Sequence, residues 1–342
     1  MNPANPTSST TKRRAILRAS AAVGLGAAGF LRHSSAQTTT QSGSWAGKQI
    51  KIIVPQTPGG ASDALSRTVA QELGKRWGVQ IVVENRAGAG GTIGSDLVAK
   101  SAPDGLTWLM SYSGTHAINP WLYKSLPFDT LKDLTPLAPL ATLPFMLVIN
   151  PKVPAKNLAE FVAYAKANPS VLNMASSGNG SVGHLLGEML NSAAGIKITH
   201  IPYKGAAGAL TDVIGGQAQA VFASAPSVMG HIRSGAVRAL GASGSKRAAV
   251  LADVPTFLEA GYAPLGLDSW FAFFVQGNTP PALVRELNAE LVKLLATKEV
   301  MERFTAQGAD VMNTPLDAFN KVVRDDLEKW GKAVKESGAR LD

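Results

Sequence analysis

The sequence has no cysteine among its 342 residues, and it has few aromatic residues (6%) and few charged ones (17%). Without cysteine the chain can form no disulfide, no thiolate site for zinc or an iron–sulfur cluster, and no cysteine nucleophile. The chain is long, and 45% of its residues are hydrophobic, which is enough to form a sizeable core. At roughly 100 to 200 residues per domain, this length predicts about two domains, each with its own core.

Charge is also scarce once the N-terminus is set aside. The formal net charge is +9, but residues 1–36 hold five basic residues and no acidic one, so the remainder carries only +4. Its basic clusters are short, such as Lys75-Arg76 and Lys246-Arg247. A nucleic-acid-binding protein is expected to show a basic stripe interleaved with aromatic residues. We therefore expect no nucleic-acid partner.

The first 36 residues have the pattern of an export signal. A basic stretch is followed by thirteen mostly small, apolar residues, Ala19 to Leu31, and then by Ser34-Ser35-Ala36, which suits a signal peptidase. Thirteen residues at about 1.5 Å each are too short to cross a hydrocarbon core of about 30 Å. We expect cleavage after Ala36, before Gln37, and a periplasmic protein.

The route of export stays open. The stretch from Lys12 to Arg18 resembles a twin-arginine signal, although Lys12 and Ile16 depart from its usual residues, and a general secretory signal fits equally well. Residues 37–47, rich in Thr, Ser, Gln and Gly, predict a flexible leader. No later run reaches 18 apolar residues, so no transmembrane helix is expected.

From residue 48 onward, short apolar runs alternate with helical patterns. Ile50 to Val54 predicts a buried strand, and Asp63 to Trp77 a helix with apolar residues four apart. A second helix, Leu158 to Ala167, should end at Asn168-Pro169, because the residue before a proline disfavours the helical conformation. Strands that alternate with helices indicate parallel sheets flanked by helices. The predicted fold class is α/β.

Four glycine-rich turns follow predicted strands. Glycine lets the backbone approach a ligand closely, and a helix that begins directly afterwards presents unpaired N–H groups to an anion. In open parallel sheets, ligands bind beyond the carboxyl ends of the strands, where these turns would lie. The turns are Pro58-Gly59-Gly60 with Asp63, Gly88-Ala89-Gly90-Gly91, Ser176-Ser177-Gly178-Asn179-Gly180-Ser181, and Tyr203-Lys204-Gly205 after Pro202.

Several side chains in these turns suit a carboxylate ligand. The serine hydroxyls of the third turn are placed at a helix N-terminus. Asp63 would repel an anion, so we expect it to fix its loop as a capping or first-turn acid. Lys204 either adds one positive charge to the site or is simply exposed. His184 is four residues from Glu188, but no HExxH motif accompanies the pair, so an anion site is a better match than a metal.

Signals for an enzyme are weak. Gly178, Gly180 and Gly183 have the spacing of a dinucleotide-binding fingerprint, yet the next predicted strand ends at His200-Ile201-Pro202 without the acidic residue that would bind ribose. No Gly-x-Ser-x-Gly elbow occurs after the signal, which argues against a serine hydrolase. We expect no cofactor, no metal and no catalytic residue.

The ordered set of motifs resembles the Bug family, the extracytoplasmic solute receptors of tripartite tricarboxylate transporters, through nearly the whole mature chain. The motifs are Ile52-Ile53-Val54-Pro55, Pro58-Gly59-Gly60 with Asp63, Val83-Glu84-Asn85-Arg86, Gly88 to Gly91, Pro103-Asp104-Gly105, Phe128-Asp129 with Lys132-Asp133, Ser177 to His184, Pro202 to Gly205, Asp253 to Thr256, Glu259-Ala260-Gly261 and Thr279-Pro280-Pro281.

The resemblance implies a two-lobed periplasmic-binding-protein fold of type II, the Venus flytrap, with a mainly parallel sheet in each lobe. Two crossover strands are expected near Met146 to Asn150 and Asp268 to Val275. Lobe 1 would then comprise residues 48–147 and 271–342, and lobe 2 residues 148–270.

The resemblance also implies a monomeric receptor that closes on a small carboxylate or amino acid and delivers it to a two-subunit membrane transporter. A receptor that feeds a membrane sensor and, more remotely, an α/β enzyme remain as alternatives. The family usually has an aromatic residue where this chain has Gln56-Thr57, which suggests a more polar ligand or an extra water at that wall. The expected ligand-binding residues are Gln56, Pro58, Gly59, Gly60, Asp63, Ala89, Gly90, Gly91, Ser176, Ser177, Gly178, Gly180, Ser181, His184, Tyr203, Lys204 and Gly205.

Overall fold

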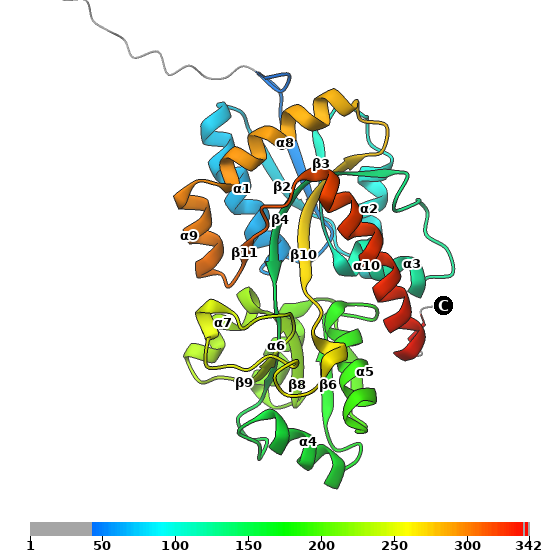
Figure 1. Ribbon diagram of the computed structural model, residues 1–342, viewed down its shortest axis with the longest axis vertical. Coiled ribbons are helices and arrows are strands. Elements are labelled where there is room, and N and C mark those ends of the chain that lie inside the picture. The colour runs from blue at the N-terminus through cyan, green and yellow to red at the C-terminus, as the bar shows by residue number, and fades with distance from the viewer. Residues whose placement is uncertain (1–42, 338, 341–342) are drawn as a thin grey trace, which may run out of the picture. The chain divides into compact units, whose positions relative to one another are not determined.

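The structure, a computed structural model, describes residues 43–337, 339 and 340 (Figure 1). The expected export signal, its cleavage site and most of the expected leader lie outside these residues. The last part of that leader belongs to the core, since Trp45 is 3% exposed and stacks on Trp77 with ring centroids 4.1 Å apart. None of the described helices combines the length and apolar character needed to cross a membrane.

One sheet has six strands in the order β11-β4-β10-β3-β1-β2. Its strands are β1 (Ile50–Val54), β2 (Ile81–Asn85), β3 (Thr107–Tyr112), β4 (Leu134–Leu143), β10 (Ser269–Gln276) and β11 (Asp310–Val311). β1 is parallel to β2 and β3, whereas β10 is antiparallel to β3 and β4, and β11 is antiparallel to β4. We call this sheet and its helices lobe 1.

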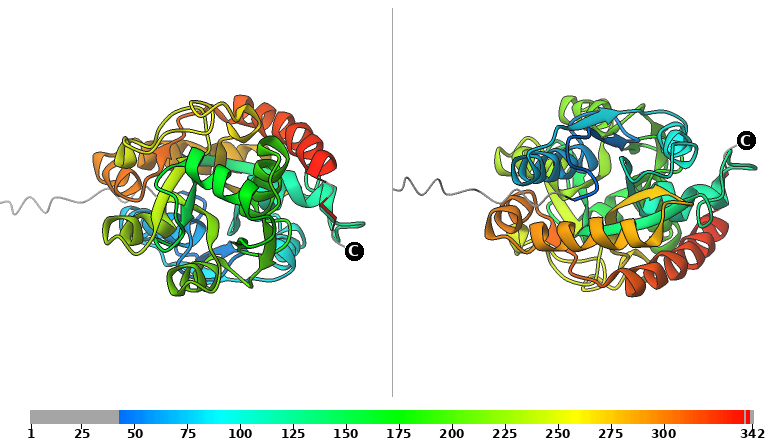
Figure 2. Two further views of the ribbon diagram at one scale, coloured as in Figure 1. Left: turned by 90° about the horizontal axis from the view of Figure 1, so that it is seen from below. Right: turned by 90° about the horizontal axis from the view of Figure 1, so that it is seen from above.

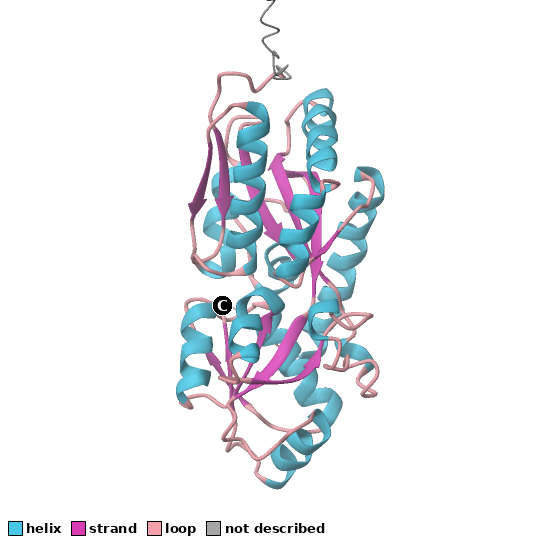
Figure 3. Ribbon diagram, turned by 90° about the vertical axis from the view of Figure 1, so that its left-hand side faces the viewer, coloured by secondary structure: helices cyan, strands magenta, loops and turns pink. Residues whose placement is uncertain are grey.

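Helices cover both faces of the lobe 1 sheet (Figures 2 and 3). They are α1 (Ala61–Trp77), α2 (Thr92–Ala99), α3 (Asn119–Leu122), α8 (Pro281–Leu295), α9 (Lys298–Ala306) and α10 (Leu316–Ser337), with a π-helical turn at Gly114–Ile118. Successive residues of β1 point to opposite faces. Ile52 accordingly belongs to the apolar cluster that contains Leu65 of α1, and Ile53 to a separate cluster with Val98 of α2.

The second sheet has five strands in the order β7-β6-β8-β5-β9. Its strands are β5 (Phe145–Ile149), β6 (Asn173–Ser176), β7 (Thr199–Pro202), β8 (Ala220–Ser224) and β9 (Arg238–Ala242). Its helices are α4 (Leu158–Ala167), α5 (Val182–Ala194), α6 (Ala206–Gly215) and α7 (Ala225–Arg233). β6 is parallel to β7 and β8, and β5 is antiparallel to β8 and β9. We call this sheet and its helices lobe 2.

The α/β class is confirmed, with one correction: both sheets are mixed and not mainly parallel. The antiparallel strand β4 was not predicted, because it contains Pro136 and Pro139. Proline has no N–H group to donate to the neighbouring strand, so its presence argues against a strand. Beside these prolines the pairing of β4 with β10 shifts register, between Phe271 and Ala272 and between Phe273 and Phe274. Such irregularities are where a strand tolerates proline.

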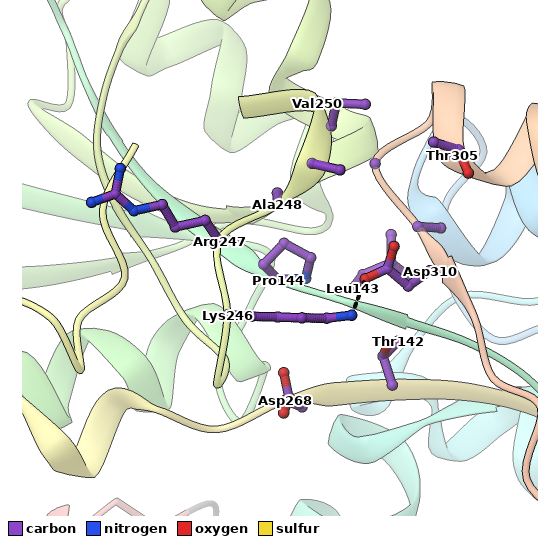
Figure 4. Close-up of a pocket in the computed structure, with 13 residues that line it drawn as sticks. Thr142, Leu143, Pro144, Lys246, Arg247, Ala248, Val250, Asp268, Thr305 and Asp310 are labelled. Carbon is purple, nitrogen blue, oxygen red and sulfur yellow. Dashed lines mark ion pairs between the residues drawn. The ribbon is translucent and has the colours of Figure 1, made fainter. Parts of the chain in front are cut away.

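The chain passes from lobe 1 to lobe 2 at Pro144, which joins β4 to β5, and returns between Ala242 and Ser269. The first passage lies just before the expected crossing near Met146 to Asn150, and the second ends where the expected crossing from Asp268 to Val275 begins, because β5 lies wholly in one sheet and β10 wholly in the other. Near the passages, Lys246 forms an ion pair with Asp310 (Nζ to Oδ2, 3.1 Å; Figure 4). This pair joins the returning segment to β11 of lobe 1.

Candidate ligand-binding site

A cavity of about 710 Å³ lies between the two sheets. It is lined by residues that follow the carboxyl ends of β1, β2 and β3 in lobe 1 and of β6, β7 and β8 in lobe 2. These are the ends at which open α/β sheets bind their ligands. A volume of several hundred Å³ is typical of small-molecule sites.

Five helices begin at this cavity. The N-cap residues of α1, α2, α5, α6 and α7 are Gly60, Gly91, Ser181, Gly205 and Ser224, and all five line it. The first N–H groups of a helix lack partners within the helix and carry partial positive charge. Among the described residues that line the cavity, Lys204 alone has a charged side chain. The site therefore favours an anion.

In lobe 1 the turn before α1 is fixed by a buried carboxylate. Asp63 is 6% exposed, and its Oδ2 accepts a hydrogen bond from the Gly59 N–H at 3.1 Å while its Oδ1 accepts one from Arg67 Nε at 3.0 Å. Burial raises the pKa of Asp63, but hydrogen bonds from Arg67, Gly59 and Asn85 outweigh it and leave the pKa lowered. Asp63 thus stays ionised in the first turn of α1 and does not line the cavity.

In lobe 2 the turn before α5 is fixed by two stacked histidines, His184 and His200, whose ring centroids are 3.9 Å apart. Nδ1 of His184 accepts a hydrogen bond from the Gly180 N–H at 3.1 Å, and Nε2 of His200 lies 2.6 Å from Oγ of Ser176. Burial, with a smaller contribution from His200, lowers the pKa of His184 to about 4. Burial also lowers the pKa of His200 to about 4, so both rings are neutral at pH 7.

Five aromatic residues border the cavity, and all but Tyr123 are buried core side chains: Tyr112, Tyr123, Phe145, Phe222 and Phe271. Tyr112 of β3 pairs with Phe271 of β10, and their rings stack with centroids 5.6 Å apart and an interplanar angle of 15°. Burial raises the pKa of the Tyr112 hydroxyl to about 12.

The side chain of Gln56 interacts with Ser62 and with Tyr112. Its Oε1 accepts a hydrogen bond from Ser62 Oγ at 2.5 Å, and its side chain also bonds the Tyr112 hydroxyl. The amide oxygen is thus engaged within lobe 1. Gln56 and Thr57 both line the cavity, so a polar wall for the ligand at this place stays a prediction.

The two lobes touch across the mouth of the cavity. A Cβ placed on Gly205 of lobe 2 would collide with the side chain of Thr57 in lobe 1. Because glycine has no Cβ, Gly205 can lie this close to Thr57. Gly205 therefore contributes to the contact between the lobes and is also the N-cap of α6.

The structure brings most of the expected site residues together. Those that line the cavity are Gln56, Gly60, Ala89, Gly90, Gly91, Ser177, Gly178, Ser181, Tyr203, Lys204 and Gly205. Those that are not among its lining residues are Pro58, Gly59, Asp63, Ser176, Gly180 and His184. The hydroxyl of Ser176, fully buried, is bonded to His200 and to the Gly178 N–H.

Sequence reasoning missed two groups of lining residues. The aromatic residues were one, because they lie on strands or, for Tyr123, directly after α3, and not in the glycine-rich turns that were searched. The other is Ser224 with Ser227 at the start of α7, whose hydroxyl oxygens lie 3.0 Å apart. The search for glycine-rich turns could not find them, although Pro226 directly after Ser224 and Ala225 is a usual signal of a helix start.

Among the described residues, no group of three or more His, Asp or Glu side chains could hold a metal ion. His184 and Glu188, which by sequence are a poor match for a metal site, have Nε2 and Oε1 4.0 Å apart.

A family model matches most of the chain. Residues 65–339 match the tripartite tricarboxylate transporter family receptor. The chain belongs to this family. BugT of Bordetella pertussis is 39% identical over 86% of this chain and 90% of its own length. The resemblance to Bug receptors is thereby confirmed, and since the family consists of solute-binding receptors, the chain is not an enzyme.

Solved structures of the receptor family share the fold. An R. palustris protein with adipate is 30% identical and has a TM-score of 0.84 over 87% of this chain and all of its own. MatC from Rhodopseudomonas palustris, with bound malate, is 31% identical and has a TM-score of 0.79 over 84% of this chain and 98% of its own. The two-lobed periplasmic-binding-protein fold is therefore confirmed.

Proposed function

We propose that this receptor captures a small carboxylate in the cavity between its lobes and delivers it to a membrane transporter. The observation that carries the proposal is the convergence of five helix N-termini, together with Lys204, on one cavity shared by both lobes. Helix N-termini stabilise anions through free N–H groups and the helix dipole. Relatives with adipate and malate support a carboxylate as the ligand class.

Binding would proceed by capture and closure. The carboxylate accepts hydrogen bonds from backbone N–H groups at the helix starts and from the hydroxyls of Ser177 and Ser181, and ordered waters bridge the rest. The lobes then rotate about the passages at Pro144 and between Ala242 and Ser269. A ligand favours the closed form only if it contacts both lobes better when they are closed.

The family and the N-terminal pattern also support a proposed cellular setting. Residues 1–36 direct export and are removed before Gln37, and the mature monomer works in the periplasm beside a two-subunit membrane transporter. A family of transporter receptors and an export signal are consistent with this setting.

Titration calorimetry tests the proposal. The protein from Gln37 onward, unfolded and refolded to strip bound ligand, is titrated with mono-, di- and tricarboxylates and with amino acids. We expect a dissociation constant in the micromolar range or tighter, about −8 kcal/mol. Absence of binding by protein that circular dichroism shows to be folded would contradict a carboxylate receptor.

A pair of lysine variants locates the site. Lys204→Gln should weaken binding about two- to threefold, since an exposed charge contributes roughly 0.5 kcal/mol, and should reduce its dependence on salt. Lys197→Gln removes an exposed lysine of the same lobe that does not line the cavity and should change neither. Equal effects of the two variants would place the anion elsewhere.

A further inference from the structure

We infer that helix α10 is a third connection between the two lobes, in addition to the two passages of the chain, and that it restricts their rotation to one axis. α10 is a helix of lobe 1, yet it also contacts α5 of lobe 2. In Figure 1, α10 (red) runs down the side of the molecule toward α5. The inference goes beyond the proposed function, and it can be tested without a ligand.

The two passages by themselves constrain the lobes little, because they lie side by side. Ser269, where the chain returns to lobe 1, pairs with Leu143 directly before Pro144. At the lobe 2 end, Ala242 pairs with Met146. A pair of neighbouring strands can twist as well as bend. A single axis of rotation therefore requires a further contact at some distance from the passages.

The first half of α10 is fixed to lobe 1. Phe319 and Val323 are buried in the apolar cluster that contains the β10 side chains of this lobe. Asp326 accepts a hydrogen bond from Trp270 Nε1 at its Oδ2, at 2.6 Å, and Trp270 directly follows the second passage. α10 therefore moves with lobe 1 from the point at which the chain returns to it.

The last turns of α10 belong to a different apolar cluster. Trp330, Ala333 and Val334 are buried, and their cluster also contains Leu185 of α5, with Met189 of α5 packed against it. We call these five residues the α10–α5 seam. Because the seam joins a helix fixed to lobe 1 with a helix of lobe 2, it is a contact between the lobes.

The orientation of α5 supports this assignment. A Cβ on Gly183 or Gly187 would meet atoms of β8 or β6, so the face with these glycines lies on the lobe 2 sheet. Leu185 lies about 200° around the helix from both, on the opposite face. It is nevertheless 0% exposed. Among the described elements, α10 and the turn Ala263–Leu265 pack on α5 from outside its sheet, so α10 helps to cover this face.

The seam limits how the lobes can move. Packed side chains interdigitate, so a twist of one lobe against the other would separate them, whereas a rotation about the seam and the passages keeps them packed. The N-cap of α5, Ser181, lines the cavity. A rotation of this kind carries Ser181 toward or away from lobe 1 along one path. The receptor without ligand should therefore sample a narrow range of lobe arrangements.

Energy transfer between two fluorophores on the full-length protein, without ligand, measures this range. The sequence has no cysteine, so Lys166→Cys on α4 and Arg285→Cys on α8, both at exposed positions, place one label on each lobe. We expect one narrow distribution of transfer efficiency. Val334→Ala should widen this distribution about twofold or more, because the lost methyl groups leave a cavity in the seam.

Two further variants separate the seam from a general loss of packing. Val323→Ala removes the same atoms from the same helix, but within the lobe 1 cluster, so it should lower the urea midpoint without widening the distribution. Met189→Ala weakens the seam from α5 at a partly exposed position, and it decides the question if Val334→Ala does not fold. An unchanged width in folded Met189→Ala and Val334→Ala, or an equal widening in Val323→Ala, would overturn the inference.

Discussion

The turns that begin α1 in lobe 1 and α5 in lobe 2 stand at equivalent places, each after the carboxyl end of a parallel strand and before a helix. They are fixed by opposite means. The first is held by an ionised carboxylate, Asp63, which accepts from the Gly59 N–H. The second is held by a neutral ring, His184, which accepts from the Gly180 N–H.

The difference has a consequence for binding. A carboxylate inside the first turn neutralises the partial positive charge at the N-terminus of its own helix. A neutral acceptor does not, so this charge can still attract an anionic ligand. A backbone turn can therefore be made rigid in two ways that look alike in a glycine-rich sequence. Only the second leaves the helix N-terminus uncompensated, so within the proposed function we expect the helix starts of lobe 2 to contribute more to anion binding than the start of α1.

The largest expected effect is the response of the two turns to acid. His184 has a pKa of about 4 in the folded protein and an ordinary value of 6.5, so between these values the unfolded state binds more protons. The free energy of unfolding should therefore fall as the pH drops from about 6.5 to 4, by about 3 kcal/mol from His184 alone. Asp63 has a lowered pKa, so its contribution is present above its ordinary 3.8 and is lost only at lower pH.

Urea unfolding at a series of pH values measures this difference. His184→Asn should flatten the loss of stability between pH 6.5 and 4. A slope that His184→Asn does not alter would show that the turn of lobe 2 is not held by this ring.

The next effect concerns the contact between the lobes. Gly205→Ala should weaken ligand binding roughly 30-fold, or about 2 kcal/mol, because the added Cβ collides with Thr57 and holds the lobes apart. Thr57→Gly in the same chain should restore part of the affinity. Gly215→Ala, at the other end of α6 where a Cβ meets no atom within 4 Å, is the matched control. Calorimetry that finds no loss for Gly205→Ala would contradict closure at this point.

Helices and strands could be predicted well from the sequence where residues within the element itself determine its bounds. Strand β1 and helix α4 have the expected bounds, the latter because Asn168-Pro169 ends it. The glycine-rich turns were recognised because several glycines directly after a predicted strand are typical of a tight turn. The aromatic residues that border the cavity could not be recognised in this way. Tyr112 and Phe271 are core residues in the structure as well, and whether a core side chain also borders a cavity depends on where the other lobe lies.

The smallest of these effects separates stability from binding at a helix N-cap. Ser181 Oγ accepts from the His184 N–H at 3.3 Å, and Asn157 caps α4 by accepting from the Glu160 N–H at 2.9 Å. Replacing either with alanine should lower the free energy of unfolding by about 1 kcal/mol. Only Ser181→Ala should also weaken carboxylate binding, since α4 begins away from the cavity. If both variants lost stability alike and neither lost affinity, the start of α5 would serve the fold of lobe 2 and not the anion.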